Sequence, residues 1–228
     1  MFEAILMRGD GLDGLRIALV ILSLAASLGY LAIESRPPSV LRTGLKTAAI
    51  GLWVPLPLLA LPGGAALPLL LLALAFLLSS AGDFFLALKG DARNFQRGLL
   101  AFLAAHLFYL VIMVPLASRP EGLVANAASL LTGAGALALY FWLRPSLGSS
   151  QLPVAVYLVT ILFMALAALA IPAAQPWLGL GAVLFVISDG VIAADKFGRR
   201  IPFRGPIVWT TYYAGQALMG LSLLTLLR

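Results

Sequence analysis

The sequence predicts an all-α integral membrane protein, a bundle of eight transmembrane helices that forms a single domain over residues 1–228. Composition is the first reason: 62% of the 228 residues are hydrophobic and 11% are charged, with a mean hydropathy of +1.04. Soluble domains are roughly 45–50% apolar and about 25% charged. The second reason is that apolar runs of about 20 residues, the length that crosses a bilayer, fill nearly the whole chain.

The expected helices follow one another between charged or Pro/Gly-rich breaks. These breaks read ESRPP, PGG, KGDAR, SRPEG, RPS, PAAQP and KFGRR in chain order. The second helix is the weakest of the set, because Pro55 and Pro57 must kink it. The expected helices cover residues 15–33, 44–61, 66–88, 96–117, 123–143, 152–171, 175–195 and 206–227.

The basic residues predict the orientation in the membrane. The termini and even-numbered loops hold only Arg8, Arg16, Arg119 and Arg228. The positive-inside rule therefore places the odd-numbered loops in the cytoplasm and both termini outside, in the inner membrane if the source is bacterial. The net charge of +6 is explained by loop residues, so no nucleic-acid partner is expected. The odd-numbered loops and their flanks hold Arg36, Arg42, Lys46, Lys89, Arg93, Arg97, Arg144, Lys196, Arg199, Arg200 and Arg204.

The two halves of the chain permit an internal duplication. Halving eight helices gives two sets of four with the same direction. The segments SAGDFFLALKGDARNFQRG and ISDGVIAADKFGRRIPFRG then correspond, and each carries an aspartate followed by a basic loop. Two parallel four-helix repeats and a chance similarity both remain open.

Several chemistries lack the residues that they need. The chain has no cysteine and one histidine, which cannot supply the three ligands of a membrane zinc hydrolase. No nucleophile-elbow pattern supports a serine triad of His106, Ser188 and an aspartate. No phosphate-binding or dinucleotide glycine pattern is present. We therefore expect no cofactor and no metal.

Two aspartates lie inside expected helices, whereas the other seven acidic residues lie at chain ends or in loops. Asp83 and Asp189 precede Lys89 and Lys196 by six and seven residues, which places both about 9–10 Å inside the same membrane boundary. A carboxylate at a helix centre costs about 2.5–3.5 kcal/mol to insert. We expect the two to face each other, a cavity or basic partners. The alternative is an interhelical clamp, in which each aspartate binds a serine, a tyrosine or Lys46.

Other polar residues are expected at a similar depth and suggest a lined pocket. Each also has a simpler explanation: an interfacial tyrosine, an interhelical hydrogen bond, a snorkelling lysine or a buried histidine. Helix 96–117 carries the only histidine, and Tyr109 shares its face. The expected pocket residues are Lys46, His106, Tyr109, Tyr157, Ser188, Tyr212 and Gln216.

A carboxylic acid and a carboxylate in one pocket are suited to acid/base hydrolysis through an oxocarbenium-like state. Asp83 and Asp189 are the expected catalytic pair, and their individual roles stay open. A transporter or lipid-binding protein with protonatable aspartates is an alternative. An intramembrane aspartyl protease is a third reading, although its fuller glycine and proline motifs are missing.

Five segments together resemble the YhhN-like lysoplasmalogenase family of eight-span membrane proteins. The segments are GDFFLAL at 82–88, FQRGLLAFLAAHLFYL at 95–110, VAVYLV at 154–159, GAVLFVISDGVIAADKF at 181–197 and YYAGQAL at 212–218. Lys46 also fits this resemblance, whereas Gly190 after the Ser-Asp pair departs from it.

The resemblance implies hydrolysis of the vinyl-ether bond of lysoplasmalogens, which gives a fatty aldehyde and a glycerophospho-base. It implies a lysophospholipid substrate drawn from membrane lipid, and it makes Asp83 and Asp189 the catalytic positions. Lys46 is the first choice for the cation that binds the phosphate, followed by Arg93 or Arg97. A homodimer stays open.

Overall fold

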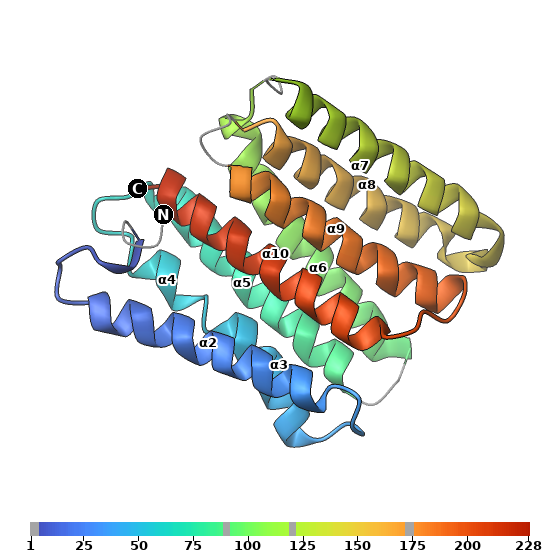
Figure 1. Ribbon diagram of the computed structural model, residues 1–228, viewed down its shortest axis with the longest axis horizontal. Coiled ribbons are helices and arrows are strands. Elements are labelled where there is room, and N and C mark those ends of the chain that lie inside the picture. The colour runs from blue at the N-terminus through green and yellow to red at the C-terminus, as the bar shows by residue number, and fades with distance from the viewer. Residues whose placement is uncertain (1–4, 89–91, 119–121, 172–175) are drawn as a thin grey trace. The chain divides into compact units, whose positions relative to one another are not determined.

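The computed structural model describes residues 5–88, 92–118, 122–171 and 176–228, and within these ranges every regular element is a helix (Figure 1). Lys89 and Arg119, which the topology prediction uses, lie outside the described residues. The α-helices are α2 Asp13–Ile33, α3 Val40–Gly51, α4 Pro55–Leu58, α5 Ala66–Ala87, α6 Ala92–Met113, α7 Gly122–Leu143, α8 Gln151–Leu169, α9 Pro176–Phe197 and α10 Arg204–Leu226. Short 3₁₀ turns cover Val114–Leu116, Arg144–Ser146 and Gly148–Ser150.

The prediction of one kinked second helix is wrong. Helix α3 begins at Val40, because the side chain of Ser39 accepts a hydrogen bond from the backbone N–H of Arg42 at 3.2 Å and caps the helix. Proline has no N–H and its ring clashes with the preceding turn, so the helix stops at Gly51 and tight turns lead to Pro55, where α4 starts.

Among the residues that the structure describes, six helices are long and apolar enough to cross a membrane, whereas the sequence predicted eight spans. These are α2, α5, α6, α7, α8 and α9; the spans of α6 and α7 include the 3₁₀ turn that follows each helix, and the span of α8 includes the 3₁₀ turn before it. Helix α3 has 12 residues and a length of about 18 Å, which is short of the ~30 Å hydrocarbon core. Helix α10 carries Thr210, Thr211 and Gln216, which lower its apolar character. The protein is an integral, multi-pass membrane protein.

The helices form two compact units. Unit 1 comprises Met1–Ile112 with Gly220–Arg228, and unit 2 comprises Met113–Met219. This division does not follow the halving of the chain that a four-helix duplication requires. Each unit is described by itself below.

Unit 1 is built around α3, which packs against both α2 and α5 (Figure 1). The indole N–H of Trp53 donates to Ser23 Oγ at 2.8 Å, and Ser23 Oγ donates to the carbonyl of Ala49 at 2.5 Å. Trp53 also packs on Phe76, with ring centroids 5.7 Å apart. Gly220 completes this core, because a Cβ there would stand 2.6 Å from the Phe76 ring. Hydrogen bonds and close packing thus fix α3 between its neighbours.

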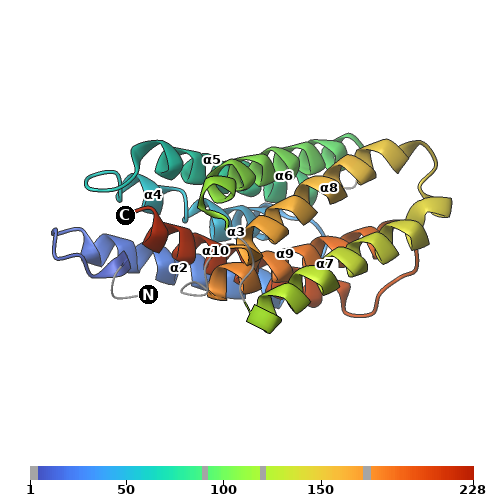
Figure 2. The same cartoon turned by 90° about the horizontal axis from the view of Figure 1, so that it is seen from above.

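Unit 2 contains α7, α8 and α9, which run side by side (Figure 2). Helix α10 approaches α9 closely, since a Cβ on Gly181 would lie 2.9 Å from the carbonyl oxygen of Gly215. The turn between these helices is held by Asp195, which accepts the backbone N–H of Ile201 at 3.0 Å and pairs with Arg204 at 3.2 Å. These contacts fix the register of α9 against α10.

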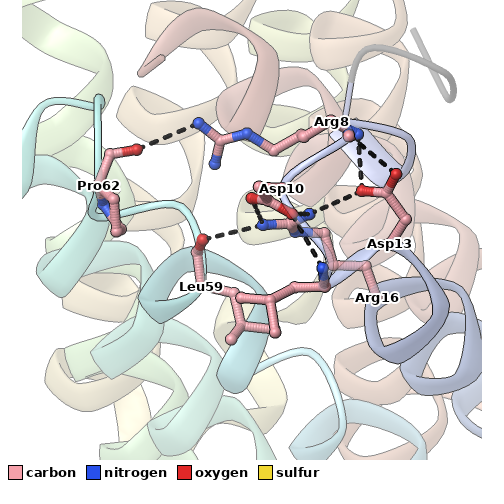
Figure 3. Close-up of polar contacts among 8 residues, drawn as sticks. Arg8, Asp10, Asp13, Arg16, Leu59 and Pro62 are labelled. Carbon is pink, nitrogen blue, oxygen red and sulfur yellow. Dashed lines mark hydrogen bonds and ion pairs between the residues drawn. The ribbon is translucent and has the colours of Figure 1, made fainter.

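A cluster of charged residues lies at the start of α2 in unit 1 (Figure 3). Arg16 is only 2% exposed and forms ion pairs with Asp10 and, at 3.1 Å, with Asp13. Its guanidinium also donates to the carbonyl of Leu59 at 3.2 Å, and Arg8 donates to the carbonyl of Pro62 at 3.2 Å. The cluster therefore ties the chain before α2 to the segment that follows α4.

This cluster makes the stability of the protein sensitive to acid. The hydrogen bond from Arg16 lowers the pKa of Asp10 below its ordinary value of 3.8, so the carboxylate stabilises the fold above that pH. We expect this stabilisation to be lost as the pH falls below about 4, towards the lowered pKa. Thermal unfolding in detergent from pH 7 to pH 3 measures it. Asp10→Asn should remove part of the acid sensitivity, and an identical pH profile in that variant would contradict the expectation.

Candidate active site

The centre of unit 1 holds an ion pair between two helices. Lys46 on α3 places its Nζ 3.2 Å from Asp83 Oδ1 on α5. The Asp83 side chain is 2% exposed and that of Lys46 is 13% exposed. Asp83 is the only charged residue of α5, and its carboxylate is held inside the unit by a cation from the neighbouring helix.

More cationic and aromatic groups surround Lys46. Its ammonium lies 5.9 Å from the ring centroid of Tyr30, and the guanidinium of Arg42 lies 5.7 Å from the same centroid. Arg42 is one turn nearer the start of α3 and donates through Nε to the carbonyl of Glu34 at 3.0 Å. The α2–α3 side of the site is therefore basic.

A groove of about 670 Å³ opens between α3 and α5. Its volume falls within the roughly 300–1,000 Å³ of small-molecule sites. Ser80 does not add a free hydroxyl to the wall, because its Oγ donates to the carbonyl of Thr47 at 2.8 Å. The groove is lined by Pro38, Ser39, Val40, Thr43, Gly44, Thr47, Ala48, Gly51, Ser80, Phe84, Ala87 and Leu88.

Asp189 lies on α9 in unit 2 and has a neutral partner. The hydroxyl of Tyr157 on α8 donates to Asp189 Oδ2 at 2.5 Å, and both residues are partly buried. Ser188 is fully buried and donates to the carbonyl of Val208 on α10 at 3.2 Å. The two aspartates therefore differ in their neighbours: an ammonium for Asp83 and a phenol for Asp189.

The remaining predicted site residues are also buried. Gln216 Nε2 donates to the hydroxyl of Tyr212 at 3.5 Å within α10, and the Tyr212 ring packs edge-on against Phe185, with centroids 5.2 Å apart. In unit 1, His106 and Tyr109 on α6 are 0% exposed, and Tyr109 meets Phe76 edge-on at 6.2 Å. Within the described ranges, no three His, Cys, Asp or Glu side chains gather in a way that could hold a metal.

The structure brings predicted residues together in pairs. Lys46 joins Asp83, Tyr157 joins Asp189, and Tyr212 joins Gln216. The first two pairs are the contacts that the clamp alternative named. Each joins two helices, so both aspartates have a structural role. The matched depth of the two aspartates stays a prediction, since Lys89 lies outside the described residues.

The sequence prediction included Lys46 but missed the groove and the position of Arg42 over Tyr30. Small residues recur on one face of α3, at Gly44, Ala48 and Gly51, and Ser39 caps that helix. Ser39 follows two prolines and is a typical helix-capping residue. This signal would have placed the start of α3, and with it the face of small residues, correctly.

Apolar helices that carry ionisable residues in their buried faces define a multi-pass membrane protein with an intramembrane polar site. The chain belongs to the YhhN family, whose model matches residues 41–223. The predicted family resemblance is thereby confirmed.

Curated relatives of this chain carry one activity in their names. It is 34% identical over 150 residues to "Lysoplasmalogenase" from Mycobacterium bovis, covering 64% of this chain and 57% of that protein. It is 39% identical over 155 residues to "Lysoplasmalogenase TMEM86A" from Homo sapiens, covering 63% of this chain and 61% of the relative. With "Lysoplasmalogenase TMEM86B" from Mus musculus the identity is 35% over 164 residues, with shares of 72% and 66%. No solved structure gives a significant match. The matched region spans about three fifths of the length of the mycobacterial and human TMEM86A relatives.

The Lys46–Asp83 pair predicts a characteristic pattern of stabilities. Removing one partner leaves a buried charge, so Lys46→Met and Asp83→Leu should each lower the free energy of unfolding by roughly 3–5 kcal/mol. The double variant Lys46→Met/Asp83→Leu has no unpaired charge and should be within about 1 kcal/mol of the unchanged protein. Thermal unfolding in detergent compares the four proteins. Additive losses in the double variant would show that the two side chains do not stabilise each other.

Proposed function

We propose that this protein hydrolyses the vinyl-ether bond of lysoplasmalogens in the membrane, releasing a fatty aldehyde and a glycerophospho-base. The observation that carries the proposal is the buried carboxylate of Asp83, held by Lys46 between α3 and α5, the two helices that also form an apolar groove. The names of the relatives support it independently, since lysoplasmalogenases occur among both the bacterial and the mammalian ones.

The proposed reaction needs one acid, one carboxylate and water. The acid donates a proton to the second carbon of the alkenyl chain, so the first carbon and the ether oxygen share an oxocarbenium charge. Water adds to the first carbon and gives up a proton to the carboxylate, which forms a hemiacetal. The hemiacetal then loses the glycerol oxygen as an alcohol and leaves the aldehyde. Water is the only co-reactant, and the catalysis is general acid–base and electrostatic.

We propose that Asp83 and Asp189 take these two roles. The ammonium of Lys46 suits a negative charge at Asp83 that stabilises the oxocarbenium ion and accepts the proton of water. The neutral hydroxyl of Tyr157 beside Asp189 suits a carboxyl group that exchanges a proton with the substrate. Tyr157 is then a positioning residue, and Lys46 sets the charge of the site.

Deuterium labelling tests the reaction directly. Purified protein in detergent is incubated with a lysoplasmalogen in D₂O, and the aldehyde is reduced at once to the alcohol to stop exchange. Protonation of the vinyl ether predicts one deuterium on the second carbon, together with equimolar glycerophospho-base. Absence of aldehyde, with substrate-driven proton uptake in liposomes, would instead support a transporter, and cleavage of helical peptides would support a protease.

If the two aspartates are catalytic, replacing either one should lower turnover while the protein stays folded. Asp83→Asn and Asp189→Asn should each lower the rate of aldehyde release by about 10²–10⁴-fold, because an amide neither donates the proton nor carries the charge. The matched control is Asp195→Asn, since Asp195 lies in the last turn of α9 and pairs with Arg204. Size-exclusion profiles check that each variant is folded. Turnover at the control rate in either test variant would exclude that aspartate from the reaction.

A further inference from the structure

A small cavity in unit 1 is lined by three arginines. It lies where the residues before α2 meet α4 and the end of α10, and its volume of about 10 Å³ has room for about one water-sized atom. Arg8, Arg16 and Arg228 line it, and within the described ranges no carboxylate does. The other lining residues are all apolar. They are Ile5, Leu56, Ala60 and Leu224.

One of the arginine nitrogens has no acceptor. Arg8 donates through Nη2 to the carbonyl of Pro62 at 3.2 Å, and its other terminal nitrogen points away from Pro62 (Figure 3). This Nη1 atom is buried and has no hydrogen-bond partner among the residues that the structure describes. A buried charged donor without an acceptor is costly. We therefore expect an acceptor in the cavity that Arg8 lines.

The charges around the cavity do not balance. The carboxylates of the cluster, Asp10 and Asp13, both pair with Arg16, and Asp13 also accepts the backbone N–H of Arg8 at 2.7 Å. Three guanidinium groups against two carboxylates leave one positive charge. Burial and the nearby charges of Arg8 and Arg16 lower the pKa of Arg228, because the cations repel one another. A water molecule can accept a hydrogen bond here, but only an anion also compensates the charge.

The size and the walls of the cavity select the kind of anion. Phosphate, sulfate and carboxylate groups need room for several oxygen atoms, whereas this cavity has room for about one atom. The apolar walls cannot replace the hydration shell of a strongly hydrated anion. One excess positive charge is balanced by one monovalent anion. Chloride is monatomic, monovalent and weakly hydrated, so it meets all three conditions.

We propose that Arg8, Arg16 and Arg228 bind one chloride ion in this cavity. The ion joins the segment before α2 to the end of α10 and so stabilises unit 1. The three arginines lie outside residues 41–223, which the YhhN family model matches, so family membership does not imply this site. The proposal also does not rest on the proposed hydrolase activity.

A chloride titration tests the proposal. Thermal unfolding is followed in detergent at neutral pH while sodium chloride replaces sodium gluconate at constant ionic strength, which keeps screening unchanged. Chloride at tenfold above its Kd should lower the unfolding equilibrium constant about tenfold and raise Tm by about 3–6 °C, and the gain should saturate. Equal Tm in the two salts would overturn the proposal, because water or a carboxylate of the chain would then satisfy the arginines. A gain with phosphate or sulfate but not with chloride would overturn it as well.

Two charge-removing variants locate the effect. Arg8→Gln and Arg228→Gln each leave the cluster without excess charge, so each should abolish the gain from chloride while the protein stays folded in gluconate. The matched control is Arg199→Gln, an exposed arginine after α9 in unit 2, which should keep the full gain. A purely structural role for Arg8 would lower Tm equally in both salts. An intact chloride response in both test variants would contradict the proposal.

The line width in chlorine NMR measures binding without unfolding the protein. Exchange of chloride with a site on the large protein–detergent particle should broaden the signal, and excess bromide should narrow it again by competition. Arg8→Gln should broaden the signal much less than Arg199→Gln does. Equal broadening by these two variants would place the bound chloride elsewhere and overturn the assignment.

Discussion

The ion pair between Lys46 and Asp83 is the interaction on which unit 1 depends. Helix α3 is too short to cross the bilayer, so its place is fixed by contacts with α2 and α5 rather than by the membrane. The ion pair joins it to α5, and the hydrogen bond from Ser80 to Thr47 adds a second link. A buried carboxylate with a cationic partner is far less costly than an isolated one, which explains how Asp83 is tolerated in an apolar helix.

The Lys46–Asp83 ion pair can be explained by a structural role or by a catalytic one. Interhelical pairing alone would account for Lys46 and Asp83, and the tyrosine bond of Asp189 has an equally simple structural explanation. What favours a chemical role is the open apolar groove formed by the same two helices, since a clamp needs no adjacent space. Membership of the YhhN family and the names of the relatives point the same way.

Much of this arrangement follows from the sequence. Helices α5, α7 and α10 lie within two residues of their predicted ends, because strong apolar periodicity and charged breaks define them. The solitary aspartates could be found because a charge in an apolar run is costly, and Lys46 was among their predicted partners. Asp189 and Tyr157 were predicted as site residues, but their hydrogen bond depends on the register between α8 and α9, which periodicity does not set.

Other features depend on how the helices pack, so they could not be predicted from the sequence. The break before Pro55 replaced a predicted kink, because the turns at Leu52–Val54 satisfy the backbone without a continuous helix. The groove exists only where the small face of α3 meets α5, so neither helix predicts it alone. The polar residues of α10 left it outside the apolar spans, although its length is sufficient.

The most direct measurement is the rate of aldehyde release by the Lys46→Met/Asp83→Leu protein at a stability matched to that of the unchanged protein. This variant removes the charges of the pair and keeps apolar packing between α3 and α5. If Asp83 takes part in the reaction, the protein will be folded and will release no aldehyde above background. Aldehyde release at the unchanged rate would show that the pair is only a clamp, and would contradict a catalytic role for Asp83.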